Sequence, residues 1–191
     1  MGKVAFLFAG QGAQHPGMCA DLIESEPAAK AVFDMADAVR PGTTDQCLSG
    51  TKEELAQTIN TQPCVFAADL ACARALVARG VTPDVVAGFS LGEVAALTFA
   101  GAYSDEEGFG LVCRRAELMA DAAEKNPGAM RAVVKLDAAT VERLASEAGD
   151  AWPVNYNSPL QTVVAGTPEA CERLDLLVKE AKGRAMKVAV S

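Results

Sequence analysis

Residues 82–101 read TPDVVAGFSLGEVAALTFAG and combine a short apolar run, a G-x-S-x-G pentapeptide and a helix-forming segment. The run Val85–Ala87 is typical of a buried parallel strand. The residues after Ser90 favour a helix, which Gly101 ends. A serine between such a strand and such a helix is typical of a nucleophile elbow, a tight turn that lifts the hydroxyl above the sheet.

The glycines of the pentapeptide, Gly88 and Gly92, admit two interpretations. In the first, the turn is so tight that both positions must lack side chains, and the first amides of the helix point at an oxyanion that forms at Ser90. In the second, the glycines only let a strand turn into a packed helix. The strand and helix on either side favour the nucleophile.

The composition argues against several classes of function. The chain has 191 residues, 50% of them hydrophobic and 22% charged, which is enough for one sizeable core or a main domain with a small insert. Its net charge of −8 argues against nucleic acid and anionic membrane as partners. No apolar run is long enough to span a bilayer, and the N-terminal residues lack signal-peptide features, so we expect a cytoplasmic protein.

Six cysteines and one histidine limit the possible disulfide and metal chemistry. The cysteines form no C-x-x-C pair, and Cys64, Cys72 and Cys113 lie in apolar stretches of helical spacing. We therefore expect buried, free thiols in a reducing compartment. Without clustered ligands, a metal site is not expected.

The first 126 residues are typical of an open α/β unit. A strand over residues 4–8 precedes the glycine-rich loop GQGAQHPG, residues 10–17, whose spacing matches neither a dinucleotide fingerprint nor a Walker A motif. A loop at the carboxyl end of the first strand is where such a sheet places its ligand site. We expect helices over residues 18–23 and 27–39. A third helix runs from a Thr51–Glu54 capping box to residue 59, and a fourth from Thr61-Gln62-Pro63 to residue 80. A fifth runs from a Ser104–Glu107 capping box to about residue 123.

The last of these helices carries two adjacent arginines in different settings. Arg114 has Glu117 at helical spacing, which is typical of a solvent-exposed face, whereas Arg115 has apolar neighbours such as Leu111 and Met119. A guanidinium among apolar side chains must find an anion or reach for water. Both an anion-binding arginine and a snorkelling arginine fit this pattern.

Residues after Asn126-Pro127-Gly128 follow the order β-α-β-β-α-β. We expect strands over residues 130–136, 153–157, 161–165 and 184–190, and helices over residues 138–148 and 167–181. This order is the ferredoxin-like split unit. The sequence thus predicts an α/β protein with two domains, residues 1–126 and residues 127–191.

Five segments together resemble the malonyl-CoA:acyl carrier protein transacylases: FLFAGQGAQ near the start, TQP at 61–63, GFSLGEVAAL, the arginine helix and NYNSP at 155–159. The resemblance covers the whole chain in order. It implies an α/β-hydrolase-like large domain, incomplete here, with an inserted ferredoxin-like small domain. It also implies ping-pong transfer, in which malonyl-CoA acylates a serine and the phosphopantetheine thiol of acyl carrier protein then takes the malonyl group.

The same resemblance assigns roles to individual residues. Ser90 is the nucleophile, and the amides of Gln11 and Leu91 form the oxyanion hole. Arg115 pairs with the free malonyl carboxylate, and Gln62 is a substrate-binding residue near it. The partners implied are malonyl-CoA and acyl carrier protein, with CoA thioester as substrate and no organic cofactor.

Two departures from the family pattern affect the expected activity. Phe89 precedes the nucleophile, where malonyl-specific members usually have histidine, which bears on malonyl selectivity. The family histidine that activates the serine belongs to a G-x-x-H-S-type motif, which these residues do not contain, and His15 fits a surface loop. We expect a further C-terminal segment or a second chain to supply the base and to pack on exposed apolar surface.

Two other functions use the same motifs. A serine esterase or thioesterase would use the elbow without needing Arg115. A non-catalytic acyltransferase-like module would bind carrier protein without turnover.

Overall fold

The structure is a computed structural model that describes residues 2–188. The chain divides into two compact units between Asp121 and Ala122, within the last turns of helix α7 (Asp105–Lys125). The domain boundary predicted after residue 126 lies just past the end of this helix and remains a proposal. In the part of the chain that is described, no helix is both long and apolar enough to cross a membrane.

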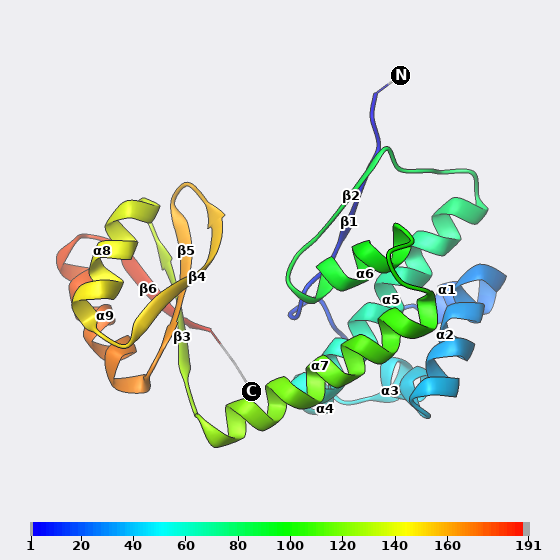
Figure 1. Cartoon of the computed structure of the whole chain (residues 1–191), viewed down its shortest axis with the longest axis horizontal. Coiled ribbons are helices and arrows are strands. Elements are labelled where there is room, and N and C mark those ends of the chain that lie inside the picture. Colours follow the sequence, from blue (N-terminus) through cyan, green and yellow to red (C-terminus); the bar gives the residue numbers. More distant parts are fainter. Residues whose placement is uncertain (1, 189–191) are drawn as a thin grey trace. The chain divides into compact units, whose positions relative to one another are not determined.

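The first unit packs helices against a two-stranded parallel sheet (Figure 1). Strand β1 (Ala5–Phe8) pairs with β2 (Val85–Gly88) in parallel. The Asp84 carboxylate accepts from the Val4 amide, and the Asp84 amide donates to the Val4 carbonyl, both at 2.8 Å, which fixes the register. The helices before α7 are α1 (Ala20–Ser25), α2 (Pro27–Val39), α3 (Thr43–Ser49), α4 (Lys52–Leu55), α5 (Thr58–Ala78) and α6 (Leu91–Phe99).

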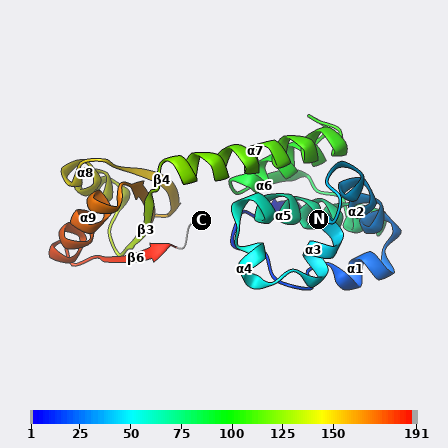
Figure 2. The ribbon, with the colours of Figure 1, turned by 90° about the horizontal axis from the view of Figure 1, so that it is seen from below.

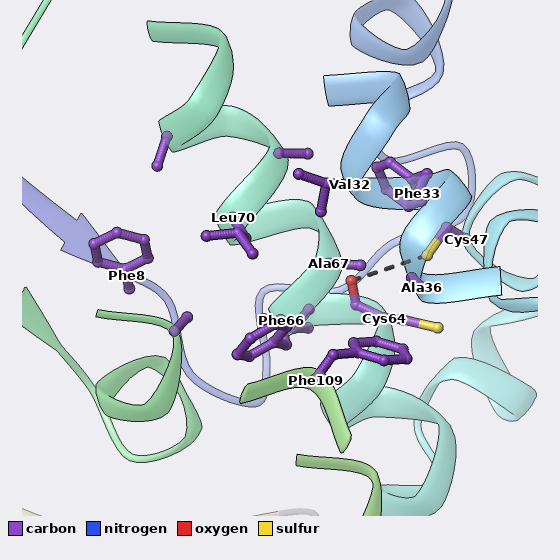
Figure 3. Packing of buried hydrophobic residues seen from close by; sticks show 14 of the residues in the cluster. Phe8, Val32, Phe33, Ala36, Cys47, Cys64, Phe66, Ala67, Leu70 and Phe109 are labelled. Atoms are coloured by element: carbon purple, nitrogen blue, oxygen red, sulfur yellow. Dashed lines mark hydrogen bonds between the residues drawn. The ribbon is translucent and has the colours of Figure 1, made fainter. Parts of the chain in front are cut away.

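Helix α5 is the centre of this unit and lies between α2 and α6 (Figures 1 and 2). Cys72 and Leu76, further along this helix, are exposed, whereas residues 61–67 are buried without interruption. Figure 3 shows the packing around them: Val32 of α2 lies beside Leu70, and the rings of Phe66 and Phe109 are 5.9 Å apart. The core of the first unit is therefore built around one helix rather than around the sheet.

The predicted start of this long helix is wrong. The Thr51–Glu54 capping box is present, but α4 ends at Leu55 and α5 begins at Thr58, so Pro63 lies inside α5 instead of in its first turn. The Thr61 hydroxyl oxygen lies 2.5 Å from the Leu55 carbonyl oxygen and 3.0 Å from that of Gln57, and its donation there supports the extra turn ahead of the proline. A proline inside a helix removes one i→i−4 hydrogen bond, yet α5 continues through Pro63 to Ala78.

Within residues 2–188, one face of this sheet is covered by other residues and the opposite face is exposed. Phe6 and Phe8 point inward, with their rings 5.6 and 5.7 Å from that of Phe99. Leu7, on the other face, is 79% exposed and Val85 is 54% exposed. The prediction of buried strands is wrong for this face within residues 2–188, because alternate side chains of a strand point to opposite faces and both need a covering layer. This face supplies exposed apolar surface of the kind expected from the sequence.

The second unit has the β-α-β-β-α-β order that the sequence predicts. Its elements are β3 (Ala129–Val134), α8 (Ala138–Ala148), β4 (Ala151–Ser158), β5 (Gln161–Gly166), α9 (Pro168–Glu180) and β6 (Arg184–Val188). The strands form an antiparallel sheet in the order β4-β5-β3-β6, which confirms the ferredoxin-like arrangement. The predicted residues 189–190 of the last strand lie outside the described residues.

Side chains cap both helices of this unit. Asp137 accepts from the Thr140 amide at 2.7 Å, and Thr167 accepts from the Ala170 amide at 3.2 Å. Such caps satisfy amides that a helix start leaves without partners. Beneath the helices the core is apolar and comprises Val133, Val141, Leu144, Ala145, Val164 and Leu174, with their neighbours.

Candidate active site

Ser90 lies in the turn between β2 and α6 with φ 56° and ψ −111°. A positive φ is unusual for a residue with a Cβ and costs about 1–3 kcal/mol, so the surroundings must impose it. The Phe89 amide donates to the Phe8 carbonyl of β1 at 3.1 Å, and the amides of Gly92 and Glu93 close the first turn of α6 at 3.0 Å. A strand, a strained and exposed serine, and a helix start form the geometry of a nucleophile elbow.

The glycines around Ser90 are required by backbone contacts. A Cβ at Gly88 would lie 2.0 Å from the Gly92 carbonyl oxygen, and one at Gly92 would lie 2.3 Å from the Phe8 carbonyl oxygen. Gly10, in the loop after β1, has Phe89 against it, so that a Cβ there would lie 2.7 Å from the Phe89 carbonyl oxygen. These distances show that the loop, the elbow and α6 are in backbone contact, as both interpretations of the pentapeptide require.

The two amides assigned to the oxyanion hole lie in different segments, one at the start of α6 and one in the loop after β1. The Leu91 amide is at the first position of α6 and makes no backbone hydrogen bond within residues 2–188. A helix N-terminus offers such amides to negative charge. Gln11 is exposed in the loop after β1, with its Nε2 donating to Thr58 Oγ1 at 3.3 Å. Their use as one oxyanion hole remains a proposal.

Arg115 of α7, Gln62 of α5 and Ser90 in the turn before α6 meet at one point. Arg115 Nη2 donates to Ser90 Oγ at 3.3 Å, and Nη1 donates to Gln62 Oε1. Gln62 is fully buried, and its Nε2 donates to Met119 Sδ at 3.2 Å. The buried amide thus orients the guanidinium toward the serine. Arg114 instead pairs with Glu117 at 2.7 Å on the exposed face, as predicted.

The structure does not place His15 against Ser90, and it shows no group of metal ligands among the described residues. His15 is exposed, and its Nδ1 lies 3.0 Å from the Pro16 carbonyl oxygen; within residues 2–188 it makes no hydrogen bond with Ser90. It lines a cavity of about 290 Å³ beside α1 and α5 that does not include Ser90. Over the same part of the chain, no group of three or more His, Cys, Asp and Glu side chains is arranged to hold a metal ion.

The six cysteines are free, but they are not all buried. Cys47, Cys64 and Cys171 are buried, Cys113 is half-buried and Cys72 is exposed. The prediction of burial is therefore wrong for Cys72. The apolar spacing of α5 extends all round the helix, and the described residues leave the side that carries Cys72 open.

Asp69 of α5 is a partly buried carboxyl that sequence reasoning missed, and it lines the same cavity as His15. Its Oδ2 is buried and makes no hydrogen bond within the described chain. Burial raises the pKa of Asp69 to about 7. A single acidic residue in an apolar helix was the only available signal.

We expect Asp69→Asn to remove a pH dependence of folding stability. The unfolded carboxyl titrates near its ordinary pKa of about 3.9. Between about pH 4 and about pH 7 the folded chain holds a proton that the unfolded chain has lost, so stability falls as the pH rises through this window. The asparagine variant should be more stable than the parent at neutral pH, by at most about 4 kcal/mol. Urea unfolding at several pH values measures this difference, and an unchanged profile would contradict it.

Comparison with known proteins places this geometry in a family. Residues 5–191 match the acyl transferase domain family. The malonyl CoA-acyl carrier protein transacylase of Bacillus subtilis (strain 168) is 38% identical over 185 residues, which cover 94% of this chain and 58% of that protein. This chain thus spans about three fifths of the length of that relative.

Solved structures give the same result. The malonyl CoA-acyl carrier protein transacylase of Clostridium perfringens superposes with a TM-score of 0.94 at 34% identity, over 100% of this chain and 61% of the other. A malonyl-transacylase solved in complex with a type II polyketide synthase acyl-carrier protein matches with a TM-score of 0.92 at 37% identity, over 100% of this chain and 63% of the other. These likenesses confirm the predicted fold class. The chain belongs to the acyl transferase domain family.

Proposed function

We propose that this chain is the serine-bearing part of a malonyl-CoA:acyl carrier protein transacylase. The observation that carries the proposal is the contact between the Arg115 guanidinium and Ser90 Oγ in a strained elbow. A nucleophile and a fixed cation at this spacing suit an acyl group that ends in a carboxylate. The named relatives, one of them bound to a carrier protein, support the same substrates.

The first half-reaction transfers the malonyl group to the protein. Ser90 Oγ attacks the thioester carbonyl carbon, and the oxyanion that forms is stabilised by the amides of Leu91 and Gln11. The carbon–sulfur bond then breaks, CoA leaves as its thiol, and a seryl ester remains. In the second half-reaction the carrier-protein thiol attacks this ester and releases Ser90.

Arg115 selects the acyl group in this scheme. Its planar fork can form two charge-assisted hydrogen bonds with the free carboxylate of malonyl-CoA, which acetyl-CoA lacks. Gln62 acts as a positioning residue, because it is buried and contacts the guanidinium rather than Ser90. A serine esterase for neutral substrates would not need this cation, so the contact favours the transacylase.

The base that takes the Ser90 proton is proposed to come from a further segment or a second chain. Arg115 donates and cannot accept the proton, and His15 makes no contact with Ser90 among the described residues. A serine hydroxyl without an adjacent base is a weak nucleophile. The non-catalytic carrier-binding module is the second candidate, and it predicts carrier binding with no acylation in any context.

The proposed reaction requires no organic cofactor, because the CoA thioester is itself the acyl donor. Both half-reactions use water-soluble substrates, so we also propose a cytoplasmic location.

Intact-mass spectrometry after incubation with malonyl-CoA tests this function. We expect a malonyl adduct when the base is supplied, and none on Ser90→Ala, because the ester oxygen is then absent. Two samples should be compared, this chain alone and this chain supplemented with the remaining two fifths of a related transacylase. An adduct only in the second sample would support a base from outside residues 2–188. No adduct in either sample, with a normal circular dichroism spectrum, would overturn the transacylase and favour the binding module.

A further inference from the structure

Helix α7, which carries Arg115, approaches α6 closely at Gly108. A Cβ at Gly108 would lie 2.0 Å from Oγ1, 2.9 Å from Cγ2 and 3.0 Å from Cβ of Thr98. Ordinary contacts between carbon atoms are about 3.5–4.0 Å long. Gly108 is buried and Thr98 is 1% exposed, so the described residues of the first unit already enclose this contact. The two helices are therefore closer than any side chain at position 108 would allow.

Thr98 cannot turn aside to make room for such a side chain. Its Oγ1 donates to the Val94 carbonyl at 2.8 Å. Its Cβ, which rotation about χ1 does not move, would itself lie 3.0 Å from the added atom. Helix α6 is held against β1 by the backbone contacts of Gly92. A side chain at Gly108 would therefore displace α7 and leave the elbow in place.

The same contact determines which residue of α7 reaches the serine. Thr98 lies eight positions after Ser90, and Arg115 lies seven positions after Gly108. At about 1.5 Å per helical residue, these separations are about 12 Å and about 10.5 Å, along two helices that run in opposite directions. The contact at one end therefore brings Arg115 level with Ser90 at the other end, where Nη2 donates to Oγ at 3.3 Å.

An ion pair fixes α7 near its start. Arg74 of α5 donates to both carboxylate oxygens of Asp105, at 2.6 and 3.3 Å. Its guanidinium carbon also lies 5.3 Å from the centre of the Phe99 ring, at the end of α6. The pair resists sliding of α7 along its axis. Separation from α6 is thus the movement by which α7 would relieve crowding at Gly108.

We propose that Gly108 is a positioning residue for recognition of the malonyl carboxylate, because it lets α7 come close enough to α6 for Arg115 to reach Ser90. The inference rests on the proposed function. The Arg115–Ser90 distance of 3.3 Å is already at the long end for an N–H···O hydrogen bond, so separation of the helices would break it. A displaced guanidinium no longer meets a carboxylate carried on the serine, although the serine itself can still be acylated.

The test measures adduct formation from malonyl-CoA and acetyl-CoA on the protein completed with the remaining part of a related transacylase. We expect Gly108→Ala to lower kcat/KM for malonyl-CoA about tenfold to a hundredfold, and that for acetyl-CoA by less than about twofold. Gly110→Ala is the control on the same helix and should keep both rates, because a Cβ there has no atom within 4 Å. Thr98→Gly combined with Gly108→Ala removes all three crowding atoms, so the malonyl rate should recover.

The selectivity between the two substrates separates positioning from a merely structural role. Equal loss with both substrates, loss of the circular dichroism spectrum in Gly108→Ala, or no recovery in the double variant would show that the contact serves folding and would overturn the inference. An unchanged malonyl rate in Gly108→Ala would overturn it as well.

Failure of the proposed function gives a different result, because the parent itself then forms no malonyl adduct. Crystal structures of the parent and of Gly108→Ala then decide whether Gly108 positions Arg115. We expect the distance from Arg115 Nη2 to Ser90 Oγ to exceed about 3.5 Å in the variant, beyond hydrogen bonding. An unchanged distance would contradict the inference.

Discussion

Replacing Arg115 by alanine should lower kcat/KM for malonyl-CoA about a hundredfold to a thousandfold, the usual consequence of losing one partner of a hydrogen-bonded charge pair. The effect on acetyl-CoA should be far smaller, because that substrate has no second carboxylate. The physical reason is the fixed position of the guanidinium, which Gln62 holds beside Ser90. The measurement is the rate of formation of each acyl adduct on the completed protein.

Arg114→Ala is the control for this prediction. Arg114 is adjacent in sequence but pairs with Glu117 on the exposed face, so both rates should match the parent. Arg115→Lys should be intermediate, because it keeps the charge and loses the planar fork. Equal loss with both substrates in Arg115→Ala would show that Arg115 maintains the elbow rather than binding a carboxylate.

Replacing Gly92 by alanine should destabilise the first unit by about 3 kcal/mol or more and abolish acylation. The added Cβ would lie 2.3 Å from the Phe8 carbonyl oxygen and 2.5 Å from that of Ala9. Both atoms belong to the backbone, so no side-chain rotation relieves the contact, and α6 must move away from β1. Urea unfolding followed by circular dichroism measures the stability, and adduct formation measures the site.

Gly110→Ala is the matched control, because it makes the same substitution at a position with room for a side chain. Gly110 lies in α7, and a Cβ there would have no atom within 4 Å. Because alanine has the higher helix propensity, this variant should be neutral or more stable by up to about 1 kcal/mol. A Gly92→Ala variant as stable as Gly110→Ala would disprove the proposed crowding at the elbow.

Features set by neighbouring residues could be predicted from the sequence. The capping boxes at Thr51 and Ser104 depend on two side chains three residues apart, and the structure contains both. The bounds of α2 and α8 also agree with the prediction, because caps or prolines mark their starts. The pentapeptide around Ser90 is local in the same way, which is why the elbow could be read from sequence.

Features set by distant residues could not be predicted. The contact of Arg115 with Ser90 joins α7 to α6, and sequence pattern alone left Arg115 between two interpretations. The exposure of Leu7 and Cys72 depends on which layers cover β1 and α5. Helix α3 has too few residues for a periodic pattern, and the sequence did not predict it.

The parallel pairing of β1 with β2 also has a kinetic consequence. Val4 contacts Asp84, 80 positions later in the chain, whereas β4 and β5 are consecutive strands joined by a tight turn. Closing a long loop costs entropy before its contacts repay it, so non-local pairing slows folding. During synthesis the helices around α5 can form first, and the elbow can assemble only after β2 has emerged and found β1. The serine can therefore acquire its strained conformation only after most of the first unit has been synthesised.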